Sequence, residues 1–247
     1  MSDSLVMVGR GLRLSRRNVD ALLTSLMLPI ILLLLFVYLF GGALNTGVPY
    51  VTYVVPGVIL LCAGFGSATT AVSVCQDMST AVIDRFRSMG ISGASVLIGQ
   101  VTASVARNLV STALVFGVAF AIGFRPTAGP LEWVATVGVL VLFISAISWF
   151  AAVIGLLASG PEAANGFSFA VMFLPYPSSA FVPIATMPGW LRGFASHQPV
   201  TPVIETVRGL LLGLPIGNHA WAAVAWCGGI TVVAIALCVV LFRRRSA

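Results

Sequence analysis

The stretch ALLTSLMLPIILLLLFVYLF occupies residues 21–40 and contains no charged residue. About 20 apolar residues in a helix are enough to cross the ~30 Å hydrocarbon layer of a bilayer. Arg13, Arg16 and Arg17 precede this run, as basic residues precede the apolar part of a signal peptide. The run is longer than the roughly 7–15 apolar residues of a signal peptide, and no A-x-A cleavage site follows it. We therefore interpret it as an uncleaved first transmembrane span.

The rest of the chain continues this pattern. Hydrophobic residues make up 59% of the 247 residues and charged residues only 8%, whereas a soluble domain has roughly 25% charged residues. The composition therefore indicates an all-α membrane protein with one domain, residues 21–247, after an N-terminal segment at 1–20. Including residues 21–40, we predict six transmembrane helices, the others being at about 51–75, 97–123, 132–157, from 165 to Pro175 and Pro177, and 220–241.

The basic residues indicate the orientation. All thirteen are arginines, and they give a net charge of +6. They are dispersed among apolar spans, which excludes a nucleic-acid-binding face. Six spans with the N-terminus inside would place ten arginines in the cytoplasm and three outside, as the positive-inside rule expects. We therefore expect a multi-pass protein of the plasma (inner) membrane with both termini cytoplasmic. The three outer arginines would be Arg125, Arg192 and Arg208.

Several kinds of chemistry are excluded or disfavoured. Without any lysine, the chain cannot form a G-x-x-x-x-G-K-[ST] phosphate-binding loop, so any nucleotide hydrolysis belongs to another polypeptide. The two histidines, His197 and His219, are 22 positions apart, and no cluster predicts a metal site. Gly64–Ser67 resembles a nucleophile turn only loosely, which disfavours an intramembrane serine protease. We expect no catalytic residue and no cofactor in this chain.

Two cytoplasmic segments have amphipathic patterns. In residues 1–20, apolar residues alternate with Arg10, Arg13, Arg16 and Arg17, which favours a helix lying on the membrane surface; a disordered basic tail is the alternative. Residues 77–92 predict a short helix, with apolar residues spaced at helical intervals and Gly90 as its end. That helix either docks a cytoplasmic partner or lies as a connector on lipid headgroups.

Residues 176–218 are rich in proline yet mostly apolar. They predict two short helices near 188–196 and 201–213, neither long enough to span a bilayer, so we interpret them as re-entrant or interfacial half-helices. Glu205 and Arg208 are spaced to pair on the second helix. This pair either neutralises two charges near the membrane or has a gating or substrate role.

At two places the sequence resembles the membrane subunit of ABC-2-type ATP-binding-cassette exporters, most closely the daunorubicin-resistance permease branch. The segments that carry the resemblance are AVIDRFRSMGIS at 81–92 and FVPIATMPGWLRGFASHQPVTPVIETVRGLL at 181–211. The six-span layout and the amphipathic N-terminus agree with it. The resemblance thus covers nearly the whole chain.

The resemblance implies a type V ABC exporter half that pairs with a second, identical or related permease copy and with two cytoplasmic ABC ATPase subunits, which would hold ATP and magnesium. Residues 1–20 would be the connecting helix. The coupling helix would lie within 77–92, with the contacts Asp84, Arg85, Phe86, Arg87 and Met89. The outer re-entrant segment, 176–213, would close the exit, and its gate residues would be Pro175, Pro177, Phe181, Pro183, Pro188, Trp190, Pro202, Glu205 and Arg208.

The expected activity is ATP-driven outward transport of a hydrophobic or amphiphilic substrate, a drug-like compound or a lipid. Export of lipid-linked glycans or polysaccharides is an alternative within the same architecture. An ion-coupled transporter and a membrane scaffold without transport activity are alternatives of other classes. The spans lack the intramembrane acidic residue that ion coupling usually requires, which favours the exporter.

Overall fold

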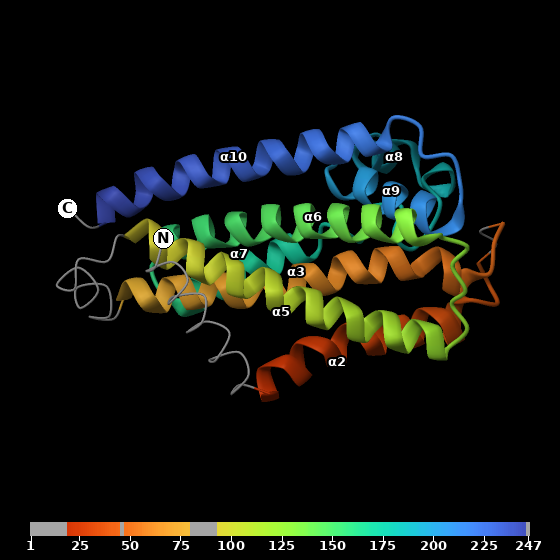
Figure 1. Cartoon of the computed structure of the whole chain (residues 1–247), viewed down its shortest axis with the longest axis horizontal. Helices are drawn as coiled ribbons and strands as arrows, with labels where there is room; N and C mark the ends of the chain where they lie inside the picture. The colour runs from red at the N-terminus through yellow and green to blue at the C-terminus, as the bar shows by residue number, and fades with distance from the viewer. Residues whose placement is uncertain (1–18, 45–46, 80–92, 246–247) are drawn as a thin grey trace.

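The computed structural model describes residues 19–44, 47–79 and 93–245, and every regular element in these residues is a helix. The elements are α2 (Val19–Leu35), η1 (Phe36–Phe40), α3 (Tyr50–Ser79), α5 (Gly93–Ala121), α6 (Pro130–Leu157), α7 (Pro161–Met172), η2 (Ile184–Thr186), α8 (Gly189–His197), α9 (Val200–Leu212) and α10 (His219–Arg245). The longer helices form an elongated bundle (Figure 1). The prediction of an all-helical chain is confirmed for this part of the sequence.

Four helices are long and apolar enough to cross a membrane. Their spanning parts are Tyr50–Met78, Ser95–Ala121, Pro130–Leu157 and His219–Phe242, and the shortest has 24 residues. At about 1.5 Å per residue even this one exceeds the ~30 Å of hydrocarbon. These helices correspond to the predicted spans at 51–75, 97–123, 132–157 and 220–241, and the chain is therefore a multi-pass membrane protein.

The first and fifth predicted spans are not confirmed at full length. The apolar helical part of the first runs over Leu26–Phe40, although α2 and η1 together continue from Val19 to Phe40. The fifth is α7, which has 12 residues and reaches only about 18 Å. Turns begin at residue 173, two residues before Pro175, whose missing N–H cannot continue a helix. The six-span layout therefore stays a prediction.

The centre of the bundle is α3. It contacts α2, α5, α6, α7 and α9, and every residue from Tyr53 to Gly64 is buried. A helix that is apolar on all sides is stable only when neighbours cover all of its faces, and the sequence VVPGVILLCAG at 54–64 has this character. The main hydrophobic core accordingly forms around its first half, with contributions from α5, α6 and α9.

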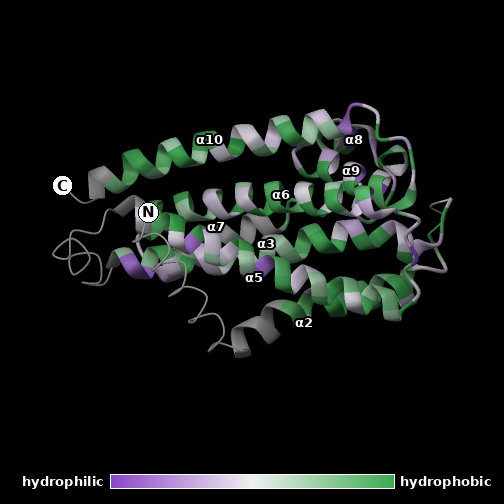
Figure 2. Cartoon of the chain, in the orientation of Figure 1, coloured by the Kyte–Doolittle hydropathy of each residue, from purple (hydrophilic) through white to green (hydrophobic). Residues whose placement is uncertain are grey.

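The edge of the bundle is α10, which packs along α6 and α9 and lies at the upper side of Figure 1. Its large apolar side chains are mostly exposed; Trp221 is 78% exposed and Val232 is 68% exposed. Figure 2 shows hydrophobic segments along the length of the long helices, with hydrophilic residues near some helix ends and also within α5. In a membrane protein such exposed apolar faces are solvated by lipid.

The two ends of the bundle differ in structure. At one end, the connections after η1, α5 and α9 gather around α8, α9 and η2 (Figure 1). There the Thr127 amide donates to the Leu211 carbonyl at 3.0 Å, and α9 ends at Gly213, whose positive φ of 65° is readily adopted by glycine. At the other end lie the end of α3, the start of α5 and the C-terminus. We call the first the α8–α9 end.

Candidate functional site

A buried arginine organises the α8–α9 end. Arg208 on α9 is only 4% exposed. Its Nη1 donates to Glu205 Oε1 at 2.6 Å, and its Nη2 donates to the carbonyls of Tyr53 at 3.1 Å and Ser179 at 2.7 Å. The guanidinium also lies 3.8 Å from the centre of the Tyr53 ring. The Glu205–Arg208 pair expected from the sequence therefore forms, and its cation ties α9 to α3 and to the segment before η2.

Hydrogen bonds join the segment at 173–182 to α3 and to the connection between α8 and α9. Tyr50 donates its hydroxyl to the Phe181 carbonyl at 3.0 Å, and Gln198 donates its Nε2 to the Pro177 carbonyl at 2.7 Å. The Phe181 ring also stacks on Phe36 of η1, with ring centroids 4.3 Å apart. The turns at 173–182 therefore make specific contacts with α3, with η1 and with the connection between α8 and α9. Together with the Arg208 contacts they make this end one connected unit.

The structure distributes the predicted gate residues unevenly. Phe181, Glu205 and Arg208 belong to the unit just described, whereas Trp190 on α8 is 80% exposed. Three prolines mark helix starts: Pro183 precedes η2, Pro188 precedes α8 and Pro202 lies in the first turn of α9. The remaining two, Pro175 and Pro177, lie in the turns after α7. The two short helices predicted near 188–196 and 201–213 are present as α8 and α9.

Two tyrosines at the start of α3 are buried rather than facing lipid. The positions of Tyr50 and Tyr53 at the start of a span are typical of an interfacial aromatic belt. They are instead 5% and 7% exposed and bind the 173–182 segment and Arg208. Sequence position alone places them near the interface, but the tertiary contacts turn them inward.

The predicted coupling-helix residues Asp84, Arg85, Phe86, Arg87 and Met89 lie outside the described residues, as do Arg10, Arg13, Arg16 and Arg17 of the predicted connecting helix. The helices that flank 80–92 are described. Gln100 on α5 donates its Nε2 to Asp77 Oδ2 near the end of α3 at 2.7 Å. This hydrogen bond joins the two helices from which the predicted coupling segment emerges.

A buried hydroxyl cluster joins α3, α5 and α6 in the middle of the bundle. Thr70 donates to Ser104 Oγ at 2.7 Å, and the Ser104 and Ser148 hydroxyls are 2.9 Å apart. Ser67 and Ser148 are 3.5 Å apart, and Asn108 Nδ2 donates to the Ser104 carbonyl at 3.0 Å. All five are at most 1% exposed. We call Ser67, Thr70, Ser104, Asn108 and Ser148 the hydroxyl cluster.

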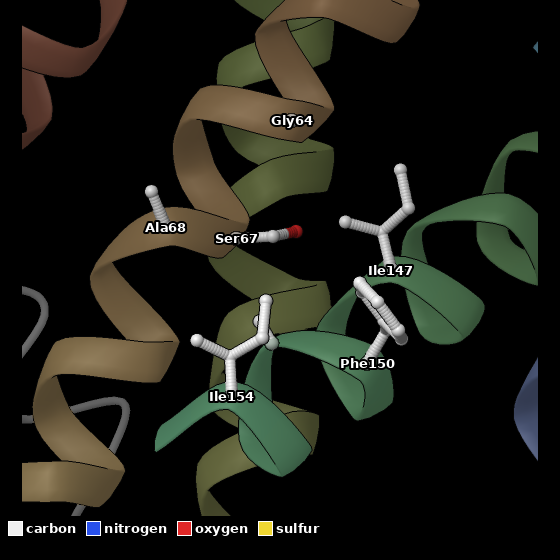
Figure 3. A pocket seen from close by; sticks show the side chains of 7 residues that line it. Gly64, Ser67, Ala68, Ile147, Phe150 and Ile154 are labelled. Carbon is white, nitrogen blue, oxygen red and sulfur yellow. The ribbon is translucent and has the colours of Figure 1, made fainter. Parts of the chain in front are cut away.

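Sequence reasoning missed this cluster. In the sequence, Ser67 stands out only through a loose resemblance to a nucleophile turn. In the structure its side chain points from α3 toward α6 (Figure 3), and its hydroxyl donates to the Ala63 carbonyl at 2.8 Å rather than to a basic side chain. His197 instead contacts the Gly193 carbonyl on α8. Polar residues four apart in a span, such as Ser104 and Asn108, are the one signal that indicates a shared polar face. Which helices meet at that face depends on the packing.

Ser104→Ala is expected to lower the free energy of unfolding by about 1 kcal/mol, because it removes the acceptor of Thr70 and the neighbour of Ser148 inside the bundle. The measurement is thermal unfolding of the full chain in detergent. Thr102→Ala is the matched control, since Thr102 is exposed on the same helix and bonds only its own helix backbone. Equal losses in the two variants would contradict a stabilising cluster.

One charged residue is deeper than the sequence suggests. In the span predicted at 97–123, Arg107 lies nearer the start, but α5 runs from Gly93 to Ala121, so that 14 residues lie on either side of it. It is half-buried there. The early start of α5, four residues before the predicted 97, accounts for the difference.

The described residues hold no group of three or more histidine, cysteine, aspartate or glutamate side chains suited to a metal ion. The four cysteines are all buried and unpaired with one another. The described residues form a membrane helix bundle with a connected unit at the α8–α9 end and a buried polar cluster.

Comparison with known families decides the class. The family model described as ABC-2 type transporter matches residues 4–212. The chain belongs to the ABC-2 type transporter family. The match includes the hydroxyl cluster, the α8–α9 end and the segment 80–92. The resemblance inferred from residues 81–92 and 181–211 is thereby confirmed.

Curated relatives of this ABC-2 transporter carry drug-resistance names. It is 29% identical over 249 residues to the daunorubicin resistance ABC transporter permease protein DrrB1 of Streptomyces coeruleorubidus, covering 100% of this chain and 88% of the relative. It is 26% identical over 252 residues to the probable doxorubicin resistance ABC transporter permease protein DrrC of Mycobacterium tuberculosis, covering 100% and 90%. The chain is thus an ABC-2 membrane permease whose relatives are drug-resistance permeases.

Proposed function

We propose that this chain is the transmembrane permease subunit of an ATP-driven ABC exporter that moves a hydrophobic or amphiphilic substrate, a drug-like compound or a lipid, out of the cell. The observation that carries the proposal is the family match over residues 4–212. The names of the two relatives support a drug-like substrate. Six spans, an N-terminal interfacial helix and re-entrant half-helices belong to this proposal.

The proposed orientation places the α8–α9 end outside the cell. Arg125 and Arg192 lie near this end, and Arg208 lies on α9 itself, while Arg243, Arg244 and Arg245 end α10 at the opposite end. The positive-inside rule then favours a cytoplasmic position for the C-terminus and for residues 80–92. In this orientation the protein lies in the plasma (inner) membrane with both termini cytoplasmic.

The proposed partners are two cytoplasmic ATPase subunits and a second permease copy, identical or related. Because this chain has no lysine for a phosphate-binding loop, ATP and magnesium would bind to the ATPase chains. The coupling helix within 77–92 would dock into them. The hydrogen bond between Gln100 and Asp77 supports this placement, since it braces the two helices that flank the segment.

A single helix, α3, could transmit movement from the ATPase subunits to the α8–α9 end. α3 ends at Ser79, beside the proposed coupling segment, and begins at Tyr50, which bonds the 173–182 segment. Its 30 residues form a rod of about 45 Å. We infer that displacement of the coupling segment moves the far end of α3 and, through Tyr53 and Arg208, the α8–α9 end. The outer unit would then open for the substrate.

The combined variant Phe86→Ala with Arg87→Glu tests the proposal. The full chain is co-expressed with the candidate ATPase and purified through a tag on the permease. We expect the variant to insert normally, to lose at least about 90% of the co-purified ATPase, and to lose substrate-stimulated ATP hydrolysis, because it removes an aromatic contact and reverses a charge at the proposed docking surface.

Arg125→Glu is the matched control, because it makes the same charge change on an exposed arginine at the α8–α9 end. It should retain the complex and the ATPase activity. An intact complex and intact stimulation in the Phe86/Arg87 variant would show that the docking helix lies elsewhere. Failure of the wild-type chain to bind any ABC ATPase would overturn the exporter proposal itself.

A further inference from the structure

Helix α8 repeats one order of side chains in its two turns. Residues 190–192 are Trp-Leu-Arg and residues 194–196 are Phe-Ala-Ser, so each run has an aromatic, an aliphatic and a polar residue in this order. Residues four apart lie on the same face of a helix. The two runs therefore place an aromatic pair, an aliphatic pair and a polar pair along α8. At about 100° per residue, the aromatic and polar pairs point in directions roughly 160° apart.

The three pairs have different surroundings. In the aliphatic pair, Ala195 is buried and Leu191 is half-buried, so this face points toward the protein, where α8 contacts α9 and η2. The polar pair is exposed. In the aromatic pair, Trp190 is 80% exposed and Phe194 is 51% exposed. The described part of the chain thus leaves two large apolar side chains on α8 mostly uncovered.

Hydrogen bonds hold α8 in this orientation. Arg192 Nη2 donates to the carbonyls of Ala185 and Met187, which precede the helix. Toward the other end, Thr201 of α9 donates its hydroxyl to the Ala195 carbonyl at 2.6 Å. The direction of the aromatic pair is therefore set by bonds on both sides of the helix.

The level of α8 is that at which the spanning helices end. It lies at the end of the bundle where α5 ends and α10 begins (Figure 1). The spanning part of α10 starts at His219, and Trp221 beside it is 78% exposed. With 9 residues, α8 is about 14 Å long and cannot cross the bilayer. A tryptophan at the ends of the spans is at the depth that this residue prefers, the boundary between lipid and water.

The exposed area is small for a protein partner. A fully buried aromatic side chain covers about 150–250 Å², so Trp190 and Phe194, which are already partly covered, offer at most about 500 Å². A stable protein–protein interface buries about 800 Å² on each partner. The pair is therefore insufficient by itself for a second permease copy. Insertion into lipid needs no such area, and an interfacial helix needs an opposite polar side, which Arg192 and Ser196 provide.

We propose that α8 is a membrane-interface anchor whose partner is the lipid surface at the α8–α9 end. Trp190 and Phe194 insert at the level of the headgroups and the upper acyl chains, while Arg192 and Ser196 face water. Gln198, directly after α8, bonds the Pro177 carbonyl, so the anchor also ties the 173–182 segment to the level of the lipid surface. The inference depends on the membrane position of the chain and on neither export nor its direction.

The first experiment maps lipid contacts by photo-cross-linking. p-Benzoylphenylalanine replaces Phe194 in one variant and Ser196 in another, and each full chain is reconstituted in nanodiscs of phosphatidylcholine and phosphatidylglycerol and irradiated. Peptide mass spectrometry measures the lipid adducts. We expect at least about fivefold more adducts at Phe194 than at Ser196, because the aromatic pair meets lipid and the polar pair meets water. The same replacement at Trp221 is the positive control.

The second experiment uses Trp190 itself as the probe. The other four tryptophans, Trp133, Trp149, Trp221 and Trp226, are replaced by phenylalanine, so that the fluorescence comes from Trp190 alone. Lipids brominated near the headgroup end of the acyl chain should quench it more strongly than iodide in the aqueous phase. Thermal unfolding establishes that the variants are folded, and each experiment tests the anchor without the other.

Equal lipid adducts at Phe194 and Ser196, or quenching of Trp190 mainly by aqueous iodide, would overturn the anchor. Cross-links between two permease copies at Phe194, in place of lipid adducts, would overturn the lipid partner and assign this face to a second copy. Neither measurement needs ATP, an ATPase subunit or a substrate. Failure of the anchor would therefore leave the exporter proposal standing, and failure of the exporter proposal would leave the anchor standing.

Discussion

Arg208→Ala is expected to lower the free energy of unfolding by about 3–5 kcal/mol. The side chain is buried, and its guanidinium satisfies the Glu205 carboxylate and the carbonyls of Tyr53 and Ser179. Removal leaves a carboxylate without its cation and takes the guanidinium donor away from two carbonyls inside the protein. It also removes the cation over the Tyr53 ring, a contact worth about 1–2 kcal/mol when desolvated.

The measurement is thermal unfolding in detergent together with limited proteolysis of residues 173–182, which should become accessible. Arg192→Ala is the control, because Arg192 is at the same end and bonds two carbonyls, those of Ala185 and Met187, but is more exposed. Its expected cost is below about 1 kcal/mol. Similar losses in the two variants would show that the buried position of Arg208 contributes little.

A double replacement distinguishes the stability contributed by the Glu205–Arg208 ion pair from the cost of leaving Glu205 without its partner. Arg208→Met combined with Glu205→Leu removes both charges and keeps apolar volume, so it should be less destabilising than Arg208→Ala alone. If the double variant is equally unstable, the bonds to Tyr53 and Ser179 rather than the ion pair account for the stability.

Gly155→Ala is expected to lower the free energy of unfolding by about 1–3 kcal/mol. A Cβ at Gly155 on α6 would overlap the Ala71 carbonyl oxygen and lie 2.9 Å from Val74 Cβ. The backbones of α3 and α6 therefore approach each other too closely for any side chain at this point, as small residues permit in membrane helices. The two helices would have to separate to make room for the added methyl group.

The same substitution at Gly138 provides the control. Gly138 is exposed on α6, and a Cβ there meets nothing within 4 Å. Gly138→Ala should raise stability by about 0.5 kcal/mol, because alanine loses less backbone freedom in a helix than glycine does. The comparison uses thermal unfolding of both variants and of the wild-type chain. A stabilising effect at Gly155 would mean that α3 and α6 are not in close contact.

Much of the fold follows from local patterns. Long apolar runs with few charged residues predict α3, α5, α6 and α10, since lipid accepts only helices that satisfy their own backbone. The prolines before and between the two short helices predict α8 and α9, and the three-residue spacing of Glu205 and Arg208 predicts their pair. The class of protein follows from motifs in 81–92 and 181–211, which the family match confirms.

Other features depend on contacts between residues far apart in sequence. Arg208 and the Tyr53 carbonyl are separated by 155 positions, and Ser67 and Ser148 by 81. No periodicity in one helix indicates which neighbour its polar residue will meet. The length of α7 is a similar case, because an apolar sequence continues past Met172 while the chain turns back to bind α3 and α9.

The apolar run at 21–40 and the later apolar runs of the chain determine by themselves that this is a membrane protein. The chain has too few charged residues to cover a surface that faces water. Its arginines and motifs determine its predicted orientation and its family. Only the tertiary structure decides that Arg208 is a buried link between three segments and that the hydroxyls of three helices form one cluster. The physical reason is that burial and hydrogen bonding depend on which helix faces are brought together, and this is a property of the packing rather than of any one segment.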